Sequence, residues 1–395
     1  MHLFFVDQYI SLDMMAPVMF RLAKKKKVFL CNFNKVQNLK ENQIYKFIIN
    51  QKNIHEVELT GKKFSKNFIF FYFLTFFLFF FSSISKKGYK YWKYIWTNYN
   101  FISKKNIINH IKKNNIKTIS IDESLVEKKR YFLIKICKEL KIPLIMNHGG
   151  LYTIKAKLKK SKKFEECTYF MSPNKIPIYT YKLNKNYLKS GKYKQFGSPR
   201  FDTEWLTILK KIYKTDISKN KKKIKVAMFL RPTSLSYNNN LKLLENLKKI
   251  NNIEVKTNLK PRDVWPTKHS NLSKNDMQSS ELIIWSDIVI SYATSIILDV
   301  ICRNKPLIYL NYLQIDKKDD TSWFDDFKFI KKGRNLNYTT QLIKNFEKNN
   351  KEYVVSKKEK SSILKKFITE PTGKRILDKY CFFYNKISKT DFKNV

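Results

Sequence analysis

Two adjacent hydroxyl side chains, Thr294 and Ser295, follow a short β-branched run and precede an apolar segment with helical spacing. This order predicts a buried strand, a turn and a helix whose first turn carries both hydroxyls. Free N–H groups and the helix dipole favour phosphate at such a position, and hydroxyl donors add to that preference. Asp299 lies four residues after Ser295, on the same predicted helical face. The pattern predicts a phosphate site, although ordinary helix capping by Ser and Thr explains the same residues.

A His-Gly-Gly sequence at 148–150 directly follows another predicted strand, residues 143–146. An imidazole at the carboxyl end of a strand is suited to act as a general base, because its ordinary pKa is close to neutral pH. Glycine beside it lets a substrate approach the backbone. We therefore predict that His148 is a catalytic base and that Gly149 lines the same site. The alternative is an exposed turn in which the histidine has no catalytic role.

Arginine is scarce among the 79 Lys and Arg residues, so its positions are informative. Arg231 follows a predicted strand at 224–230, and Lys260 and Arg262 follow another at 253–256. A guanidinium binds phosphate through two parallel hydrogen bonds, and Lys binds it as a point charge. We predict that these three cations contact the phosphates of a ligand.

A tight Gly/Pro turn, Gly197-Ser198-Pro199-Arg200-Phe201-Asp202, follows a short apolar segment. Gly and Pro are typical of a tight turn, with Gly197, Arg200 and Asp202 as its candidate functional residues. The alternative is a structural linker in which Arg200 pairs with a carboxylate.

Strand and helix patterns alternate along most of the chain, which predicts an α/β protein with parallel sheets. The first unit of this pattern consists of strand 2–6, polar loop 7–13, helix 14–23 and strand 28–31. It has no Gly-rich phosphate-binding sequence. The N-terminal half is therefore not expected to bind a dinucleotide. Further strands are predicted at 118–121, 288–290 and 307–310, and further helices at 102–113, 125–140, 204–213, 241–250, 339–349 and 358–387.

The formal charge of +47 favours nucleic acid or an anionic membrane as a partner. Lys, Asn, Ile, Phe and Tyr are abundant together, which is typical of an AT-rich genome, so part of the Lys excess reflects that bias. No nucleic-acid-binding motif is present, and no specific nucleic acid is expected. The five Cys have no paired spacing, which predicts neither a metal site nor a disulfide framework and favours a reducing cytoplasm. The N-terminus has no secretory signal pattern.

An uncharged, mostly aromatic run at 68–81 is flanked on both sides by Lys. It is shorter than the ~20 apolar residues of a membrane span, so we expect an interfacial helix, with a true span and a buried helix as alternatives. Residues 86–100 are dense in Lys, Tyr and Trp. This mixture favours a lipid headgroup region, although single-stranded nucleic acid or core packing would also accept it.

Residues 279–311 resemble the C-terminal half of GT-B-type transferases that build bacterial surface polysaccharides, including CDP-glycerol glycerophosphotransferases and capsule glycosyltransferases. The turn at 197–202 resembles their Gly-x-Pro-Arg-x-Asp turn, which implies a hinge between domains at this position. The chain departs from the glycerophosphotransferases at Ser291-Tyr292-Ala293, where they often have Asp-Tyr, and it lacks the His of their Lys-x-His-Pro-Arg loop. The residues that carry the first resemblance are Val289-Ile290, Thr294-Ser295, Ile296-Ile297, Asp299 and Asn304-Lys305-Pro306.

The resemblance implies a GT-B-like fold, with two Rossmann-like domains facing a cleft. The expected parts are an acceptor-side domain at 1–195 with a membrane-interfacial segment at 62–100, a hinge at 196–222, a nucleotide-donor-binding domain at 223–357 and a C-terminal helical crossover at 358–395. Donor phosphates would meet Arg231, Lys260, Arg262, Thr294, Ser295 and Asp299, and His148 would deprotonate the acceptor.

The implied activity is transfer of a sugar or a polyol-phosphate from a nucleotide-sugar or CDP-alcohol donor to a polysaccharide or lipid-linked acceptor. No metal and no cofactor beyond the activated donor are implied. We expect a cytoplasmic protein bound peripherally to the anionic inner face of the plasma membrane. Two alternatives are a non-hydrolysing UDP-sugar epimerase of the same fold and a non-catalytic basic protein that binds membrane or nucleic acid.

Overall fold

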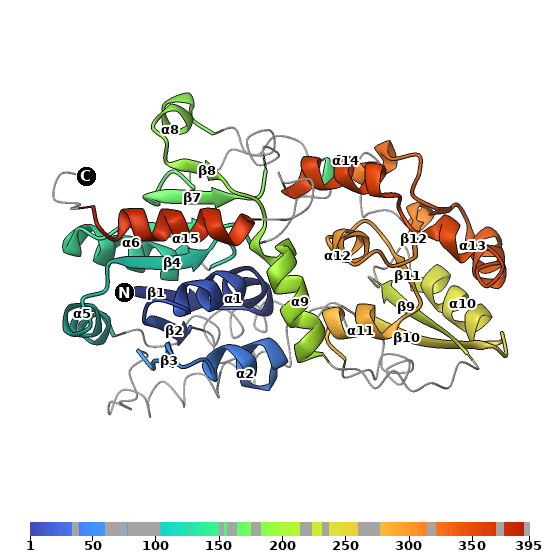
Figure 1. The fold of residues 1–395 in the computed structure, drawn as a ribbon, viewed down its shortest axis with the longest axis horizontal. Helices are drawn as coiled ribbons and strands as arrows, with labels where there is room; N and C mark the ends of the chain where they lie inside the picture. Colours follow the sequence, from blue (N-terminus) through green and yellow to red (C-terminus); the bar gives the residue numbers. More distant parts are fainter. Residues whose placement is uncertain are drawn as a thin grey trace. The chain divides into compact units, whose positions relative to one another are not determined.

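The chain forms two compact α/β units, shown in Figure 1. The first comprises Met1–Gly149, Lys163–Met171 and Leu377–Val395, and the second comprises Gly150–Lys162 and Ser172–Ile376. The computed structural model describes residues 1–33, 39–59, 77, 103–125, 127–149, 154–155, 164–174, 183–213, 223–230, 237–259, 277–313, 321–368 and 375–390.

The first sheet has seven strands in the order β3-β2-β1-β4-β5-β7-β8, and the pairs from β3 to β7 are parallel. Its central strands are buried, as expected for a parallel sheet covered by helices. The elements are β1 (His2–Val6), α1 (Tyr9–Ala23), β2 (Val28–Asn32), a 3-10 turn (Leu39–Glu41), α2 (Gln43–Ile49), β3 (Ile54–Glu56), α5 (Lys104–Lys113), β4 (Thr118–Asp122), α6 (Glu127–Leu140), β5 (Leu144–Asn147), β7 (Tyr169–Ser172), α8 (Lys185–Lys189) and β8 (Tyr193–Gln195).

The first helix begins earlier than its sequence predicts. We expected a polar loop over residues 7–13, but α1 starts at Tyr9 with Gln8 as its N-cap. The backbone N–H of Gln8 donates to the hydroxyl of Ser11, 3.3 Å away, in a reciprocal capping arrangement. Pro17 consequently lies inside the helix and not in its first turn. The loop prediction was wrong because Gln is a less familiar capping residue than Ser or Asp.

The second sheet has five strands in the order β10-β9-β11-β12-β14, all paired in parallel. Alternate residues of β9 face two separate cores. Val226 and Met228 pack with α10 and α13, whereas Ala227 and Phe229 pack with α11, α12 and α14. The elements are a 3-10 turn (Pro199–Phe201), α9 (Thr203–Ile212), β9 (Ile224–Leu230), α10 (Tyr237–Lys248), β10 (Ile253–Leu259), α11 (Ser279–Trp285), β11 (Ile288–Ser291), α12 (Ile296–Cys302), β12 (Leu307–Leu310), β14 (Lys332–Gly333), α13 (Leu336–Lys344) and α14 (Lys357–Ile368).

Short elements complete the second unit. The strand β6 (Ile154–Lys155) pairs antiparallel with β13 (Thr321–Ser322). Further 3-10 turns cover Asn311–Leu313, Trp323–Asp326 and Asn350–Tyr353.

The C-terminal segment forms two helices where the sequence predicts one. We expected a single helix over 358–387, but α14 ends at Ile368 and α15 covers Ile376–Ile387. Pro371 and Gly373 lie between them in the sequence, and both residues disfavour the interior of a helix. α14 belongs to the second unit, and all but the first residue of α15 belongs to the first.

In the part of the chain that the structure describes, no helix is long and apolar enough to cross a membrane. The aromatic run at 68–81 lies outside the described residues except for Phe77, and so does the aromatic and Lys-rich segment at 86–100. Phe77 is exposed.

Candidate functional site

The neighbouring strands β1, β4 and β5 bring three polar residues to one edge of the first sheet. Asp7 follows β1, Asp122 ends β4, and His148 follows β5. The strands are parallel, so their carboxyl ends share that edge, which is where open α/β sheets bind ligands. All three residues are buried.

The ring of His148 is fixed by the backbone of the next strand. Its Nδ1 lies 3.2 Å from the carbonyl oxygen of Met171, which also accepts the His148 backbone N–H at 3.1 Å. A carbonyl oxygen only accepts hydrogen bonds, so Nδ1 carries the proton and Nε2 carries the lone pair of the neutral ring. The side chain is 0% exposed. The alternative of an exposed turn histidine is therefore wrong.

Gly149 allows the Asp122 carboxylate to reach the backbone beside His148. A Cβ atom at position 149 would lie 2.7 Å from Oδ2 of Asp122 and 3.0 Å from its Oδ1. A side chain there would displace the carboxylate. Sequence reasoning assigned Gly149 to substrate access, and in this structure the approaching group is Asp122.

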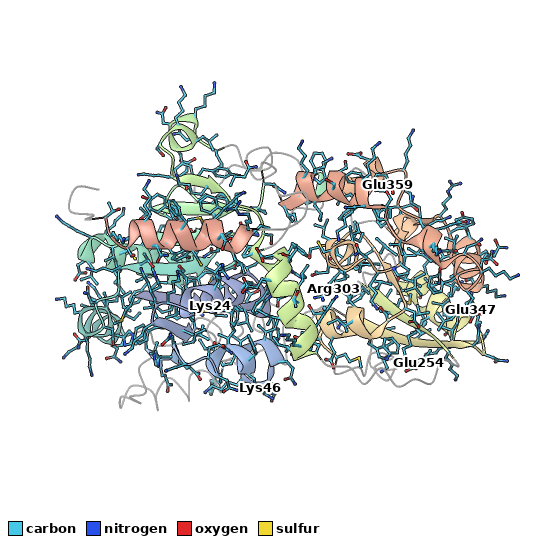
Figure 2. All side chains as sticks on the ribbon, in the orientation of Figure 1. Lys24, Lys46, Glu254, Arg303, Glu347 and Glu359 are labelled. Atoms are coloured by element: carbon cyan, nitrogen blue, oxygen red, sulfur yellow. The ribbon has the colours of Figure 1, made fainter. Side chains whose placement is uncertain are left out.

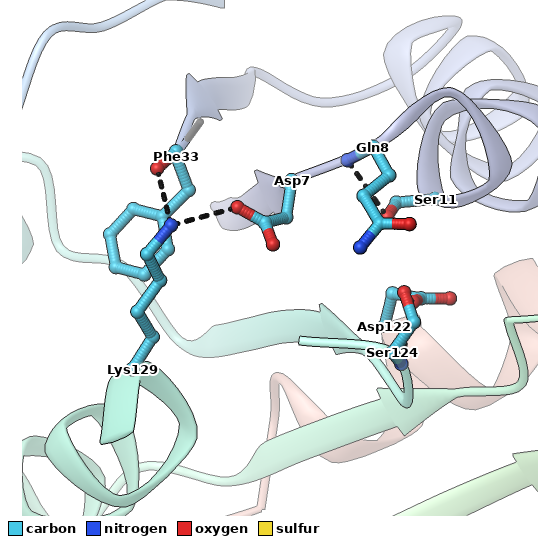
Figure 3. Close-up of polar contacts among 7 residues, drawn as sticks. All are labelled: Asp7, Gln8, Ser11, Phe33, Asp122, Ser124 and Lys129. Atoms are coloured by element: carbon cyan, nitrogen blue, oxygen red, sulfur yellow. Dashed lines mark hydrogen bonds and ion pairs between the residues drawn. The ribbon is translucent and has the colours of Figure 1, made fainter. Parts of the chain in front are cut away.

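Figure 3 shows the polar residues at these strand ends, with Asp7 near Lys129 and Asp122 near Ser124. The Asp122 Oδ1 accepts the backbone N–H of Ser124 at 2.7 Å and also contacts the Ser124 hydroxyl. Lys129 donates to Asp7 Oδ1 and to the carbonyl oxygen of Phe33, each at 2.9 Å. Both side chains of the Asp7–Lys129 ion pair are buried.

Sequence reasoning missed Asp7, Asp122 and Lys129. The signal for the two carboxylates was their position at the end of an apolar strand, the same signal that identified His148. Nothing in the sequence marks Lys129, because it belongs to a helix with several other Lys. Together these groups place an imidazole acceptor and two carboxylates at one edge, which is a chemistry suited to binding and deprotonating hydroxyl groups.

In the second unit, Thr294 and Ser295 lie between β11 and α12. Thr294 is buried and Ser295 is half-buried. Ser295 occupies the N-cap position of α12, yet its side chain makes no capping hydrogen bond. Among the described residues, neither hydroxyl has a hydrogen-bond partner. Ordinary capping, the alternative for this pair, is therefore not what their hydroxyls do here.

The carboxylate of Asp299 forms an ion pair with an arginine. Its Oδ2 accepts from Nη2 of Arg200, and both side chains are buried. The structure therefore agrees with the alternative for this turn, in which Arg200 pairs with a carboxylate. Burial raises the pKa of Asp299, while Arg200 and Arg303 act in the opposite direction.

The other residues of the turn at 197–202 also have structural contacts. Gly197 has φ +94°, and a Cβ there would lie 2.6 Å from the carbonyl oxygen of Ile368. Asp202 is the N-cap of α9, and its Oδ1 accepts the backbone N–H of Glu204 at 2.9 Å. These contacts fix the turn against α14 and begin the next helix.

The Asn-Lys-Pro sequence after α12 has a similar structural explanation. Asn304 has φ +53°, a left-handed conformation that Asn tolerates at a helix end. The ammonium of Lys305 donates to the carbonyl oxygens of Ile284 and Ser286, at the end of α11. Lys305 therefore caps a helix C-terminus.

Arg231, Lys260 and Arg262 lie outside the described residues. The strands that precede them, β9 and β10, end at Leu230 and Leu259. These strands are parallel to β11, so their carboxyl ends share the edge from which the Thr294–Ser295 turn emerges. Within the described ranges, no group of three or more His, Cys, Asp or Glu could hold a metal ion.

No protein-family model matches the sequence, and no curated protein matches it. Three examples of solved structures that resemble the chain each match 98% of its length. They are a UDP-GlcNAc 2-epimerase from Neisseria meningitidis bound to UDP-GlcNAc (TM-score 0.55, 12% identity, 99% of that chain), the wall teichoic acid polymerase TagF (0.53, 13%, 88%) and the spinosyn forosaminyltransferase SpnP (0.52, 9%, 98%).

At these identities the likeness concerns the fold. The two parallel sheets with helices on their faces match proteins that differ in chemistry and share one architecture. The chain has the GT-B fold.

Proposed function

We propose that this protein transfers a sugar or a polyol-phosphate from a nucleotide-activated donor to a hydroxyl group of a surface polysaccharide or lipid-linked acceptor. The observation that carries the proposal is the hydrogen bond from His148 Nδ1 to Met171 O, because it fixes the tautomer that a general base requires. The fold supports it, since structures of the same fold include the polymerase TagF and a glycosyltransferase.

The second unit binds the donor in this proposal. The Thr294 and Ser295 hydroxyls have no partner among the described residues, so a ligand oxygen can accept from them without breaking an internal hydrogen bond. Arg231, Lys260 and Arg262 follow strands that end at the same edge. Their charges would stabilise the negative charge that develops on the leaving nucleotide phosphate. Asp299 acts indirectly, by holding Arg200 against the helix that follows the hydroxyls.

The first unit supplies the base. Nε2 of His148 accepts the proton of the acceptor hydroxyl as its oxygen forms a bond to the transferred group and the bond to the nucleotide phosphate breaks. Asp122, beside Gly149, favours the imidazolium that results.

The aromatic run at 68–81 and its flanking Lys support a peripheral position on an anionic membrane. A membrane-bound enzyme would meet a lipid-linked acceptor at the surface where that acceptor is confined.

A second candidate is epimerisation of a UDP-sugar, because an epimerase with UDP-GlcNAc bound has the same fold. The two activities differ in their requirement for an acceptor. An epimerase converts the UDP-sugar alone, whereas a transferase releases nucleotide in proportion to acceptor consumed.

The experiment has two steps. Nucleotide-sugars and CDP-alcohols are first screened by thermal shift, since a ligand at ~100 times its Kd stabilises the fold by ~2.7 kcal/mol. The nucleotide that binds is then incubated with and without membrane-extracted polysaccharide and lipid acceptors. Acceptor-dependent nucleotide release supports the transferase. Conversion of a UDP-sugar without acceptor supports the epimerase, and binding of no nucleotide contradicts both.

A further inference from the structure

The C-terminal turn of α12 holds more positive charge than the fold neutralises. Asp299 and Arg303 lie four residues apart on this helix, the spacing at which an acidic and a basic side chain ordinarily pair. Arg200 instead contacts the Asp299 carboxylate, from the turn that precedes α9. Two guanidinium groups therefore share the neighbourhood of one buried carboxylate.

Arg303 is left without a hydrogen-bond acceptor. Its Nε, Nη1 and Nη2 atoms are all buried, and none has a partner among the residues that the structure describes. Figure 2 labels this side chain in the second unit. A guanidinium in this condition has lost its hydration without replacement, which is costly for any buried charge. The native state with this side chain is more stable if an acceptor from solution is present.

Lysine ammonium groups near Arg303 are hydrogen-bond donors, so they cannot supply the acceptor that Arg303 lacks. Lys360 donates to the carbonyl oxygen of Cys302 and to Oδ1 of Asn304, each at 2.9 Å. Lys305 donates to the carbonyl oxygens of Ile284 and Ser286, at the end of α11. Both ammonium groups complete backbone hydrogen bonding at helix ends and add to the positive potential around Arg303. Burial lowers the pKa of Arg303, and Arg200 acts in the same direction while Asp299 opposes it.

We propose that Arg303 forms a binding site for a small phosphate-type oxyanion at the C-terminal end of α12. The planar guanidinium presents donors that match two oxygens of one phosphate group. Arg200 and Lys360 contribute charge, and the enclosure of the nitrogens selects a small anion over a polymer. The ligand is free inorganic phosphate or the phosphoryl group of a nucleotide, which offer the same oxygens.

The site is separate from the proposed donor-binding turn. α12 has seven residues, so its two ends lie ~10 Å apart at 1.5 Å per residue. Thr294 and Ser295 precede the helix, and Arg303 is its C-cap. Phosphate binding at Arg303 does not require turnover, so its test is independent of the proposed enzymatic function.

Isothermal titration of the full chain with inorganic phosphate tests the proposal, with chloride replacing phosphate at constant ionic strength in the blank. We expect saturable binding to the unmodified protein. Arg303→Met should weaken the Kd at least ~10-fold, equivalent to ~1.4 kcal/mol. Arg334→Met is the matched control, because Arg334 is exposed in the same unit and stacks on Tyr338. Its phosphate affinity should be unchanged.

Absence of phosphate binding to the unmodified protein would overturn the proposal, and so would equal binding by Arg303→Met. If that variant does not fold, Arg303→Lys retains the charge without the planar fork and should still bind more weakly. A parallel titration with UDP shows whether the bound phosphate group comes from a nucleotide or from free phosphate. Phosphate that competes with UDP, together with a matching loss of UDP affinity in Arg303→Met, assigns the site to a nucleotide phosphoryl group. Unchanged UDP affinity assigns it to free phosphate.

Discussion

The guanidinium of Arg200 and the carboxylate of Asp299 form a buried ion pair between two segments that lie 99 residues apart in the sequence. Asp299 also lies beside the buried guanidinium of Arg303, so removing this carboxylate leaves two buried positive charges without compensation. We expect Asp299→Leu to lower the free energy of unfolding by ~3–5 kcal/mol, measured in urea. Asp299→Leu combined with Arg200→Met should be less destabilised than that single variant, because one of the two uncompensated charges is then gone.

The exposed pair of Lys331 and Glu352 provides the control for this measurement. Glu352→Gln should cost less than ~1 kcal/mol, as is usual for solvent-exposed ion pairs. Equal effects of Asp299→Leu and Glu352→Gln would show that burial of the Arg200–Asp299 pair does not matter for stability.

His2 makes the stability of the first unit dependent on pH. Its Nδ1 lies 2.8 Å from the Thr118 hydroxyl, and its ring packs edge-on against Tyr384. Burial, followed by the positive charges of the N-terminus and Lys26, lowers the His2 pKa to about 3. The folded pKa is below the unfolded one, so this contribution is present above pH 6.5 and is lost as the pH falls towards 3.

Between pH 7 and pH 5, His2 should reduce the free energy of unfolding by about 2 kcal/mol, because only the unfolded chain takes up its proton. Urea unfolding of the unmodified protein and of His2→Leu at both pH values measures this. The stability difference between the two proteins should shift by that amount in favour of the variant at pH 5. A difference independent of pH would mean that His2 titrates normally in the folded state.

Sequence patterns predicted the strands more accurately than the helices. The expected strands 2–6, 224–230 and 307–310 coincide with β1, β9 and β12, since these runs have the length of a strand and are shorter than most helices. Helix ends depended on capping that the patterns did not show. α1 and α11 begin after Gln8 and Gln278, and Gln is a less common N-cap than Ser, Thr, Asp or Asn.

The candidate site was only partly predictable because its contacts join distant segments. The position of His148 after a strand was readable, but the Met171 carbonyl that orients it is 23 residues away. The motif around Asp299 was also readable. Its partner was not, because either Arg200 or Arg303 satisfies the charge, and packing in three dimensions determines which one does.

The next prediction concerns donor binding by the Thr294–Ser295 turn. The double variant Thr294→Ala, Ser295→Ala should bind the donor nucleotide more weakly by several kcal/mol at most, since each hydrogen bond to a charged group contributes ~1.5–3 kcal/mol. Titration calorimetry with the nucleotide found by screening measures the loss. Thr207→Ala is the control, because its hydroxyl is used within α9, where it donates to Thr203 O. Unchanged affinity in the double variant would remove this turn from the donor site.

The membrane prediction concerns the aromatic run at 68–81. Fourteen helical residues extend ~21 Å, short of the ~30 Å hydrocarbon core, so the run should lie in the interface. We expect the protein to sediment with anionic vesicles, to be released partly by high salt and fully by detergent, and to lose attachment when Phe73, Phe76, Phe77 and Phe80 become Ser. Failure of the unmodified protein to bind such vesicles would show that the membrane prediction is wrong.

The role of His148 tests the central claim most directly. The measurement is acceptor-dependent nucleotide release by His148→Gln and by the unmodified protein, with donor affinity determined in parallel. A general base supplies ~10²–10⁴ in rate, so kcat should fall by that factor while the donor Kd stays nearly constant. A variant that retains full kcat would contradict the account, because the hydrogen bond between His148 and Met171 would then position a residue that takes no part in the reaction.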